Sequence, residues 1–202
     1  MLGLGNNRTG SVDKPLVASS AVELSSAEMF VFVKAAGLIG RFLGRDTKMR
    51  VDKFFVDYYK PQGAGTPAEL LAVRCASNSL LALSEVDANR FDRSPLTFEE
   101  CVKMDRRTRS FVLDAERHPE ILYTVESETN TEINGMLNIR GHAAPLKCTK
   151  NRNEAELVVE CGIKLSEMMV PNYGILGGLL RVDDNVTVQM RVPNAILEKH
   201  GM

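Results

Sequence analysis

Apolar and polar residues alternate with a period of two through most of this chain, and this alternation constrains the fold more than any other feature. In the segment DNVTVQMRVP, Val186, Val188 and Met190 share one face, whereas Thr187 and Gln189 share the other. Similar segments are EMFVFVKA, KFFVDYY, ELLAVRCAS, PEILYTVES, NGMLNIRG and AELVVECGIKL. Because successive side chains of a β-strand point to opposite faces, the pattern predicts half-buried antiparallel strands.

One segment breaks the alternation. Residues 94–116 are rich in charge, and they begin with Ser94, Pro95 and Thr97, residue types that favour the start of a helix. We expect a helical crossover there. About eight short strands with turn residues between them, such as the hairpin-type loop KPQGAGTP, then indicate an all-β barrel or sandwich with a short helical insertion.

The composition excludes several classes of protein. Its 25 basic and 26 acidic residues give a net charge of -1, so no nucleic-acid partner is expected. No run approaches the roughly 20 apolar residues of a transmembrane segment. The first residues lack a basic stretch followed by an apolar one, which favours the cytoplasm, or the periplasm if a leader has been removed.

The reactive residue types form no recognisable catalytic pattern. The four cysteines lack C-x-x-C spacing, so we expect buried free thiols, with a disulfide or a metal site as alternatives: Cys75, Cys101, Cys148 and Cys161. His118 precedes Pro119 and His142 follows Gly141, which favours structural corners. No serine or cysteine stands in a nucleophile motif, so we predict no catalytic residue, no metal site and no enzyme.

Three motifs carry a family resemblance. The first runs from MDRRTR (104–109) through Leu113-Asp114 to HPEI (118–121), and the second is GMLNIRGH (135–142) ending at Pro145-Leu146. The third combines NYGI (172–175) with VDDNV (182–186). In this order and spacing they resemble the YceI-like family of lipocalin-like polyisoprenoid-binding proteins, over roughly Val22 to Pro193.

The resemblance implies an eight-stranded antiparallel lipocalin-like barrel with a helical segment near the middle of the chain. It also implies an apolar tunnel for an isoprenoid chain, such as a polyprenyl alcohol, a polyprenyl phosphate or a quinone tail. We therefore divide the chain into a flexible N-terminal tail (1–20), a YceI-like β-barrel domain (21–193) and a C-terminal tail (194–202). Many relatives carry G-H-D-H where this chain has GRDT (44–47), so no role of those histidines is transferred.

The predicted site consists of a tunnel lining and a tunnel mouth. Arg41, Arg45 and Tyr173 are candidates for the mouth, where arginines would suit an anionic head group. The predicted lining is apolar and comprises Phe30, Phe32, Phe42, Phe55, Ile121, Tyr123, Leu137, Ile139, Val186, Val188 and Met190.

The sequence thus leads us to expect non-enzymatic binding of an apolar isoprenoid chain by a carrier, store or sequestering protein. No cofactor is expected beyond the bound polyisoprenoid or quinone as ligand. The alternative is a filled barrel that acts as a structural or protein-interaction module without a lipid. A homodimer is left open.

Overall fold

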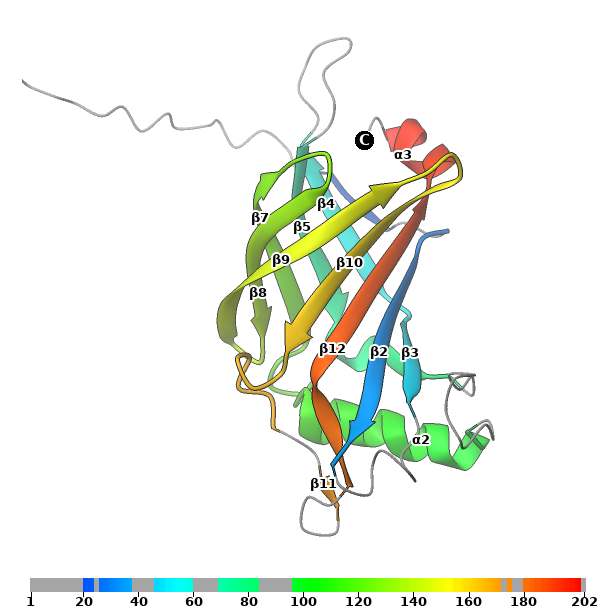
Figure 1. Ribbon diagram of the computed structural model, residues 1–202, viewed down its shortest axis with the longest axis vertical. Coiled ribbons are helices and arrows are strands. Elements are labelled where there is room, and N and C mark those ends of the chain that lie inside the picture. The colour runs from blue at the N-terminus through cyan, green and yellow to red at the C-terminus, as the bar shows by residue number, and fades with distance from the viewer. Residues whose placement is uncertain are drawn as a thin grey trace, which may run out of the picture.

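The computed structural model describes residues 20–23, 26–37, 46–59, 69–83, 96–171, 174–175 and 180–200. Their strands form one antiparallel sheet of twelve strands, which curls into a barrel (Figure 1). Along the sheet the order is β1-β4-β5-β7-β8-β9-β10-β12-β2-β3-β6, and β11 pairs with β12. The predicted all-β, antiparallel, lipocalin-like fold with a short helical insertion is confirmed.

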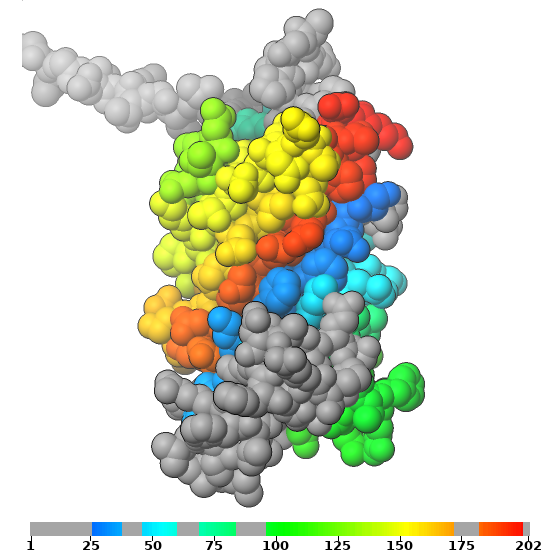
Figure 2. Space-filling model, turned by 45° about the vertical axis from the view of Figure 1, so that its right-hand side comes forward, coloured from blue at the N-terminus to red at the C-terminus, as the bar shows by residue number. Residues whose placement is uncertain are grey.

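The strands are β1 (Ser20–Glu23), β2 (Glu28–Ala36), β3 (Thr47–Val51), β4 (Phe54–Tyr59), β5 (Glu69–Ala76), β6 (Leu80–Ala82), β7 (Glu120–Glu128), β8 (Glu132–Ile139), β9 (His142–Arg152), β10 (Glu156–Lys164), β11 (Gly174–Ile175) and β12 (Leu180–Pro193). The helical elements are η1 (Ser77–Ser79), α2 (Phe98–Arg107), η2 (Thr108–Val112) and α3 (Asn194–His200). On the outer wall β9, β10, β12, β2 and β3 lie side by side (Figure 2).

The strand count exceeds the predicted eight because two long strands are broken. Only Asp52 and Lys53 separate β3 from β4, and the short η1 separates β5 from β6. Counting each broken strand once leaves eight long strands (β2, β3–β4, β5–β6, β7, β8, β9, β10 and β12) beside the short β1 and β11. The sequence pattern therefore gives the long strands but not their breaks.

The same two breaks connect the ends of the strand order. At one end β4 pairs with β5, and at the other β3 pairs with β6. Across the break, Asp52 N donates to Ser79 O (2.9 Å) and Ala76 N donates to Lys53 O (3.2 Å). The two kinked strands therefore stay hydrogen-bonded to each other while they pass from one end of the sheet to the other.

Alternation decides which residues fill the interior. In β8, Ile133, Gly135, Leu137 and Ile139 are buried, whereas the residues between them are half-buried. These residues join one core cluster with side chains from the facing strands. The apolar face of each strand thus points inward, as the period of two predicts.

The predicted helical crossover in residues 94–116 is confirmed as α2 and η2. Thr97 begins the helix: its Oγ1 accepts a hydrogen bond from Glu100 N (3.3 Å), and the Glu100 carboxylate accepts one from Thr97 N (2.8 Å). This reciprocal capping satisfies two backbone donors that the first turn would leave unpaired. At the other end, Arg140 donates to the carbonyl oxygen of Val112 (3.1 Å) and ties η2 to the β8–β9 turn.

The predicted histidine corner is also present. Arg140 and Gly141 both have positive φ (56° and 76°), as a two-residue hairpin turn with matching strand twist requires. The His118 ring lies against this turn, because a Cβ placed on Gly141 would be 3.6 Å from His118 Cε1. Both His118 and His142 therefore stand at one corner of the barrel, and neither lines the interior cavity.

The predicted C-terminal tail is a helix in the structure, which corrects the expectation. α3 follows β12 directly, and Leu197 is buried in the core cluster. α3 and α2 lie at opposite ends of the barrel (Figure 1). The predicted N-terminal tail before Ser20 and the loop KPQGAGTP lie outside the described residues.

Gly135 provides a test of this packing. A Cβ at this position would lie 2.1 Å from the carbonyl oxygen of Thr124, a backbone atom of the paired strand. We expect Gly135→Ala to lower the free energy of unfolding by about 3 kcal/mol, since the strands must separate locally. Urea unfolding measures this change.

The matched control is Gly162→Ala on β10, where a Cβ meets nothing within 4 Å. Its stability should stay the same or rise by about 0.5 kcal/mol, because alanine restricts the unfolded chain. Equal losses for both variants would contradict the close approach of β7 to β8 at Gly135.

Candidate ligand-binding cavity

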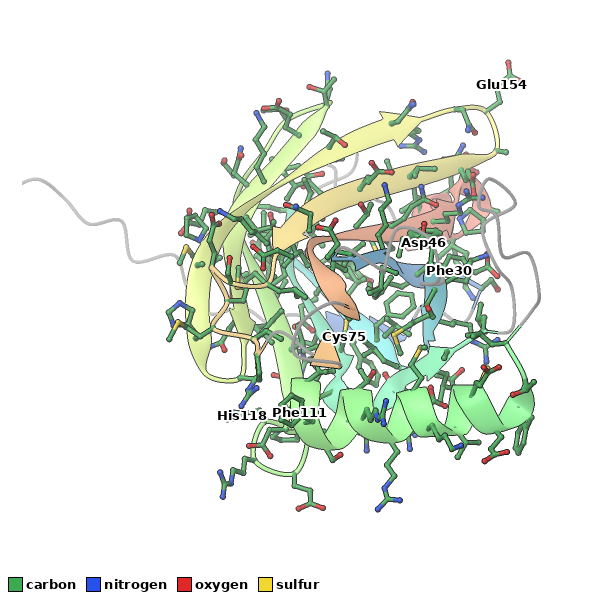
Figure 3. The ribbon with its side chains drawn as sticks, turned by 60° about the horizontal axis from the view of Figure 1, so that its bottom comes forward. Phe30, Asp46, Cys75, Phe111, His118 and Glu154 are labelled. Atoms are coloured by element: carbon green, nitrogen blue, oxygen red, sulfur yellow. A yellow bond between two sulfur atoms is a disulfide. The ribbon has the colours of Figure 1, made fainter. Side chains whose placement is uncertain are left out.

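The interior of the barrel contains a cavity of about 600 Å³. This volume lies within the range of small-molecule sites, roughly 300–1,000 Å³, and is far larger than an ordinary packing defect. Its wall is mainly apolar and comes from nearly every long strand, including Met29, Val31, Val33, Met49, Val51, Val73, Ile133, Leu146, Val159 and Ile163. Figure 3 looks at the barrel from the end where α2 lies, with Cys75 inside.

Much of the predicted lining set lies in this wall. These residues come from β7, β8 and β12 and comprise Ile121, Tyr123, Leu137, Ile139, Val186, Val188 and Met190. In each of these strands one face is clearly more apolar than the other, so the period of two was enough to choose the inward face. Their role in binding a ligand stays a prediction.

Phe30 and Phe32 require a correction, because the structure places them on the outer face of β2. Lys48 Nζ lies 4.2 Å from the centroid of the Phe30 ring, and Phe32 is paired with Lys48 in the neighbouring strand. The inward residues are instead Met29, Val31 and Val33. Both faces of EMFVFVKA are apolar, so the sequence did not distinguish them.

Phe55 also faces outward, on β4. It shares its face with Asp57, and Asp57 accepts two hydrogen bonds from the Arg74 guanidinium (both 2.8 Å) on the adjacent strand. The alternate residues Phe54 and Val56 are buried in the core cluster. The segment KFFVDYY is again aromatic on both faces, which is why period alone gave the wrong face. Phe42 lies outside the described residues.

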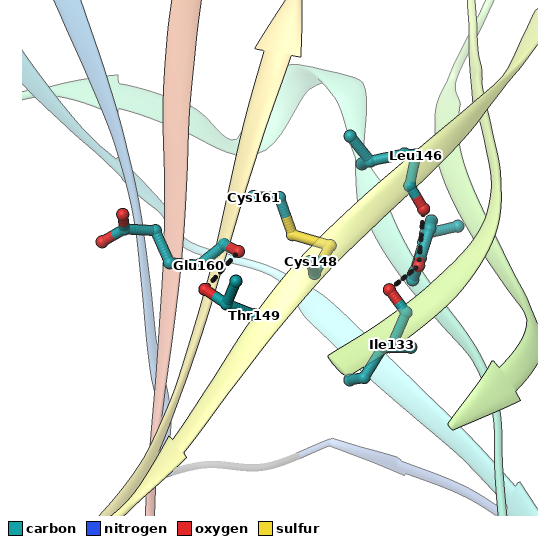
Figure 4. Close-up of a disulfide and its surroundings, with 7 residues drawn as sticks. Ile133, Leu146, Cys148, Thr149, Glu160 and Cys161 are labelled. Atoms are coloured by element: carbon teal, nitrogen blue, oxygen red, sulfur yellow. Dashed lines mark hydrogen bonds between the residues drawn. A yellow bond between two sulfur atoms is a disulfide. The ribbon is translucent and has the colours of Figure 1, made fainter. Parts of the chain in front are cut away.

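Tyr123 brings a polar group to the cavity wall, and the protein satisfies it internally. Its hydroxyl hydrogen is shared between two backbone acceptors, Leu146 O at 3.1 Å and Ile133 O at 3.3 Å (Figure 4). The ring reaches these acceptors by passing over Gly135, where a Cβ would lie 3.1 Å from Cζ. Burial, and then the charge of Glu126, raises the pKa of Tyr123 to about 12, so the hydroxyl stays neutral near pH 7.

Cys75 is the other ionisable group deep in the wall. Its Sγ lies 3.6 Å from Met29 Sδ, and burial raises the pKa of its thiol to about 12, with a smaller contribution from Glu120. A thiol with this pKa carries almost no reactive thiolate at neutral pH. The cavity wall is therefore neutral as well as apolar at both Tyr123 and Cys75.

Charged side chains gather where the cavity meets α2. This rim consists of Lys34 from β2 and of Glu100, Lys103 and Arg107 from α2. The α2 members are three or four residues apart and share one side of the helix. Their spacing was visible in the sequence, but nothing in the chain alone indicated that α2 lies at the cavity. The predicted mouth residues Arg41, Arg45 and Tyr173 lie outside the described residues.

The expectation for the cysteines also requires a correction. Cys148 on β9 and Cys161 on β10 form a disulfide, so only Cys75 and Cys101 are free thiols (Figure 4). The two cysteines are direct partners in the antiparallel register, with a Cα–Cα distance of 4.3 Å, and both line the cavity. Only the strand register brings them together, and spacing in the sequence does not reveal it.

No group of three or more His, Cys, Asp or Glu side chains in the described part of the chain could hold a metal ion. No helix among these residues is long and apolar enough to cross a membrane.

Fold and cavity together define a lipocalin-like antiparallel barrel with an apolar interior. No protein-family model matches the chain, and no curated protein matches it in sequence. Among solved structures, BcnA of Burkholderia cenocepacia is similar, with a TM-score of 0.52 and 15% identity over 84% of this chain and 97% of BcnA. A mutant CJ YceI protein with a monobromobimane guest is more distant, with a TM-score of 0.44 and 11% identity over 72% of this chain and 82% of that one.

The likeness to BcnA extends over most of both chains, so the two proteins share a fold. It is the fold that the resemblance to the YceI-like family implied, and the resemblance is confirmed at this level. At 15% identity the comparison says nothing about the ligand.

Loss of the disulfide should weaken the wall of the cavity measurably. Cys148 and Cys161 are 13 residues apart, and a cross-link that closes a loop of this size stabilises by about 3 kcal/mol. We expect Cys161→Ala to lower the free energy of unfolding by about this amount. Chemical denaturation with and without a reductant measures it.

Cys101→Ala is the control, because Cys101 is a free thiol on α2. A reductant should destabilise the wild type and this control, but leave Cys161→Ala unchanged. A wild type whose stability does not respond to a reductant, and whose mass retains both thiol hydrogens, would contradict the cross-link.

Proposed function

We propose that the protein binds one apolar lipid chain of the isoprenoid type inside its barrel, without catalysis, as a carrier, store or sequestering protein. The observation that carries this proposal is the apolar cavity of about 600 Å³. Each methylene group moved from water into such a space contributes about 0.8 kcal/mol. Several isoprene units can therefore bind tightly through their hydrocarbon alone.

The rim supports a ligand with an anionic head group. Lys34, Lys103 and Arg107 bring positive charge to the end of an otherwise apolar cavity. Glu100 is occupied with the capping of α2, where its carboxylate accepts from Thr97 N. Among the isoprenoids considered, a polyprenyl phosphate fits this charge better than a neutral alcohol or a quinone. The choice of an isoprenoid over other lipids rests on the resemblance of the sequence motifs.

The chemistry of the wall supports binding rather than catalysis. Tyr123 is engaged with two carbonyl oxygens, and the thiol of Cys75 has a pKa of about 12. Neither group suits general acid–base or nucleophilic work near neutral pH. The alternative of a filled barrel, acting only as a structural or interaction module, is disfavoured by the volume of the cavity.

The disulfide supports an oxidising compartment for this function. Cross-links such as Cys148–Cys161 persist in secreted and periplasmic proteins and are rare where thiols are kept reduced. We therefore favour the periplasm or another oxidising space over the cytoplasm that the sequence led us to expect. A homodimer stays a prediction.

Native mass spectrometry of the freshly purified protein, with an organic extract analysed beside it, tests the proposal. The expected result is a mass excess that matches an isoprenoid in the extract. A clean unliganded mass that stays unchanged after incubation with polyprenols, polyprenyl phosphates and quinones would overturn it. A bound fatty acid would support the lipid cavity but reject the isoprenoid.

A change within the cavity should weaken binding selectively. Val188→Phe places a larger side chain into the space, and we expect an affinity roughly tenfold lower, about the loss of two buried methylene groups. The control is Thr187→Phe, one residue away on the opposite face of β12 and paired with Phe32. Titration with a fluorescent polyprenyl probe measures both, and equal affinities for the two variants would contradict the cavity as the binding site.

A further inference from the structure

α2 exposes large apolar side chains to solvent. Phe98 is 86% exposed and Val102 is 47% exposed, and they lie one turn apart on the same side of the helix. Phe111, in η2 directly after α2, is 51% exposed. The other exposed large apolar side chain among the described residues is Met169. Most of this exposure is therefore concentrated on α2 and η2.

Positive charge accompanies these side chains. Lys103 and Arg106 are both exposed; Lys103 follows Val102 directly, and Arg106 lies one turn after Val102 on the same side of the helix. We call the surface formed by Phe98, Val102, Lys103 and Arg106 the α2 face. Exposed apolar residues with interleaved cations are the pattern of a helix that lies on an anionic lipid surface.

The carboxylates of α2 offset this charge only in part. Asp105 turns toward the barrel and accepts a hydrogen bond from Ala82 N (2.6 Å). Glu100 is held in the cap with Thr97, and Glu99 pairs with Lys103 (2.7 Å). Glu99 thus offsets the charge of Lys103, and Arg106 adds a further cation on the exposed side.

The α2 face also adjoins the opening of the cavity. Lys103 belongs both to this face and to the rim, and its neighbour Met104 lines the cavity itself. α2 projects from the end of the barrel, opposite α3 (Figures 1 and 2). A surface that docks through α2 would therefore lie directly beside the cavity.

We propose that the α2 face docks on an anionic lipid bilayer. Phe98 and Val102 enter the boundary between head groups and acyl chains, while Lys103 and Arg106 contact the anionic head groups. A chain could then pass between the bilayer and the cavity without crossing water. The docking stands on the α2 face alone, whereas this transfer step rests on the proposed function.

The experiment is sedimentation of the full chain with vesicles of phosphatidylcholine, either pure or with phosphatidylglycerol added. The wild type should bind the anionic vesicles, bind pure phosphatidylcholine much more weakly, and dissociate as salt is added. The double variant F98S/V102S should lose at least tenfold in affinity, and Arg106→Gln about fivefold. The matched control is Lys199→Gln on α3, an exposed cation at the other end of the barrel, which should bind like the wild type.

A fluorescent polyprenyl probe, titrated without vesicles, separates docking from cavity binding. Loss of vesicle binding by F98S/V102S with unchanged probe affinity would support docking and show that the variant is folded. A wild type that binds the probe but not anionic vesicles would overturn docking, leave the proposed function standing, and favour an acidic protein as the partner of the α2 face. A wild type that binds anionic vesicles but not the probe would support docking and overturn the proposed function. Equal binding of both vesicle types, or of wild type and F98S/V102S, would overturn docking.

Discussion

The structure depends on the two kinked strands that connect the ends of the sheet. A curled sheet that keeps a large cavity cannot rely on a packed centre to hold its shape, so its backbone ladder must do so. The bonds from Asp52 N to Ser79 O and from Ala76 N to Lys53 O continue that ladder through the bends. Ser79 adds a side-chain bond to Ala76 O (2.8 Å) and is itself buried. The bends are thus satisfied internally, as buried backbone groups require.

The opposite wall is reinforced by side chains instead. Tyr123 passes over Gly135 and bonds to the carbonyl oxygens of Ile133 and Leu146, which links β7 to β8 and β9. The Cys148–Cys161 disulfide then continues this connection from β9 to β10. The two devices hold four consecutive strands in register beside a cavity, where the side chains of the wall lack packing partners on one side.

The sequence predicts the strands well, and it predicts their inward faces only where one face is polar. In β12 the polar residues Thr187 and Gln189 identify the outer face, so Val186, Val188 and Met190 are assigned to the cavity wall. In β2 both faces are apolar. There Phe30 lies on the outer face, under the cation of Lys48 that another strand supplies. Information of this kind becomes available only when the register is known.

The dependence on strand register also explains why the sequence does not predict the charged rim and the disulfide. α2 was predictable because its capping residues are local. The spacing of Glu100, Lys103 and Arg107 also places these three residues on one side of the helix. Its position at the barrel end is a long-range property, and so is the pairing of Cys148 with Cys161. Local signals thus give the elements, whereas the rim and the cross-link depend on register and closure.

α2 has apolar residues on its exposed side and charged residues on its side toward the cavity, the reverse of an ordinary amphipathic helix. A helix that only covers a barrel would expose polar residues and turn its apolar side inward. Here the exposed side contains Phe98 and Val102, and the side toward the cavity contains Glu100, Lys103 and Arg107 beside Met104. Exposing a phenylalanine at 86% gives no folding free energy, and charges beside an apolar cavity give up part of their hydration. Stability alone does not account for this arrangement, whereas the proposed exchange of a lipid with an anionic head group between a membrane and the barrel would use both sides of the helix.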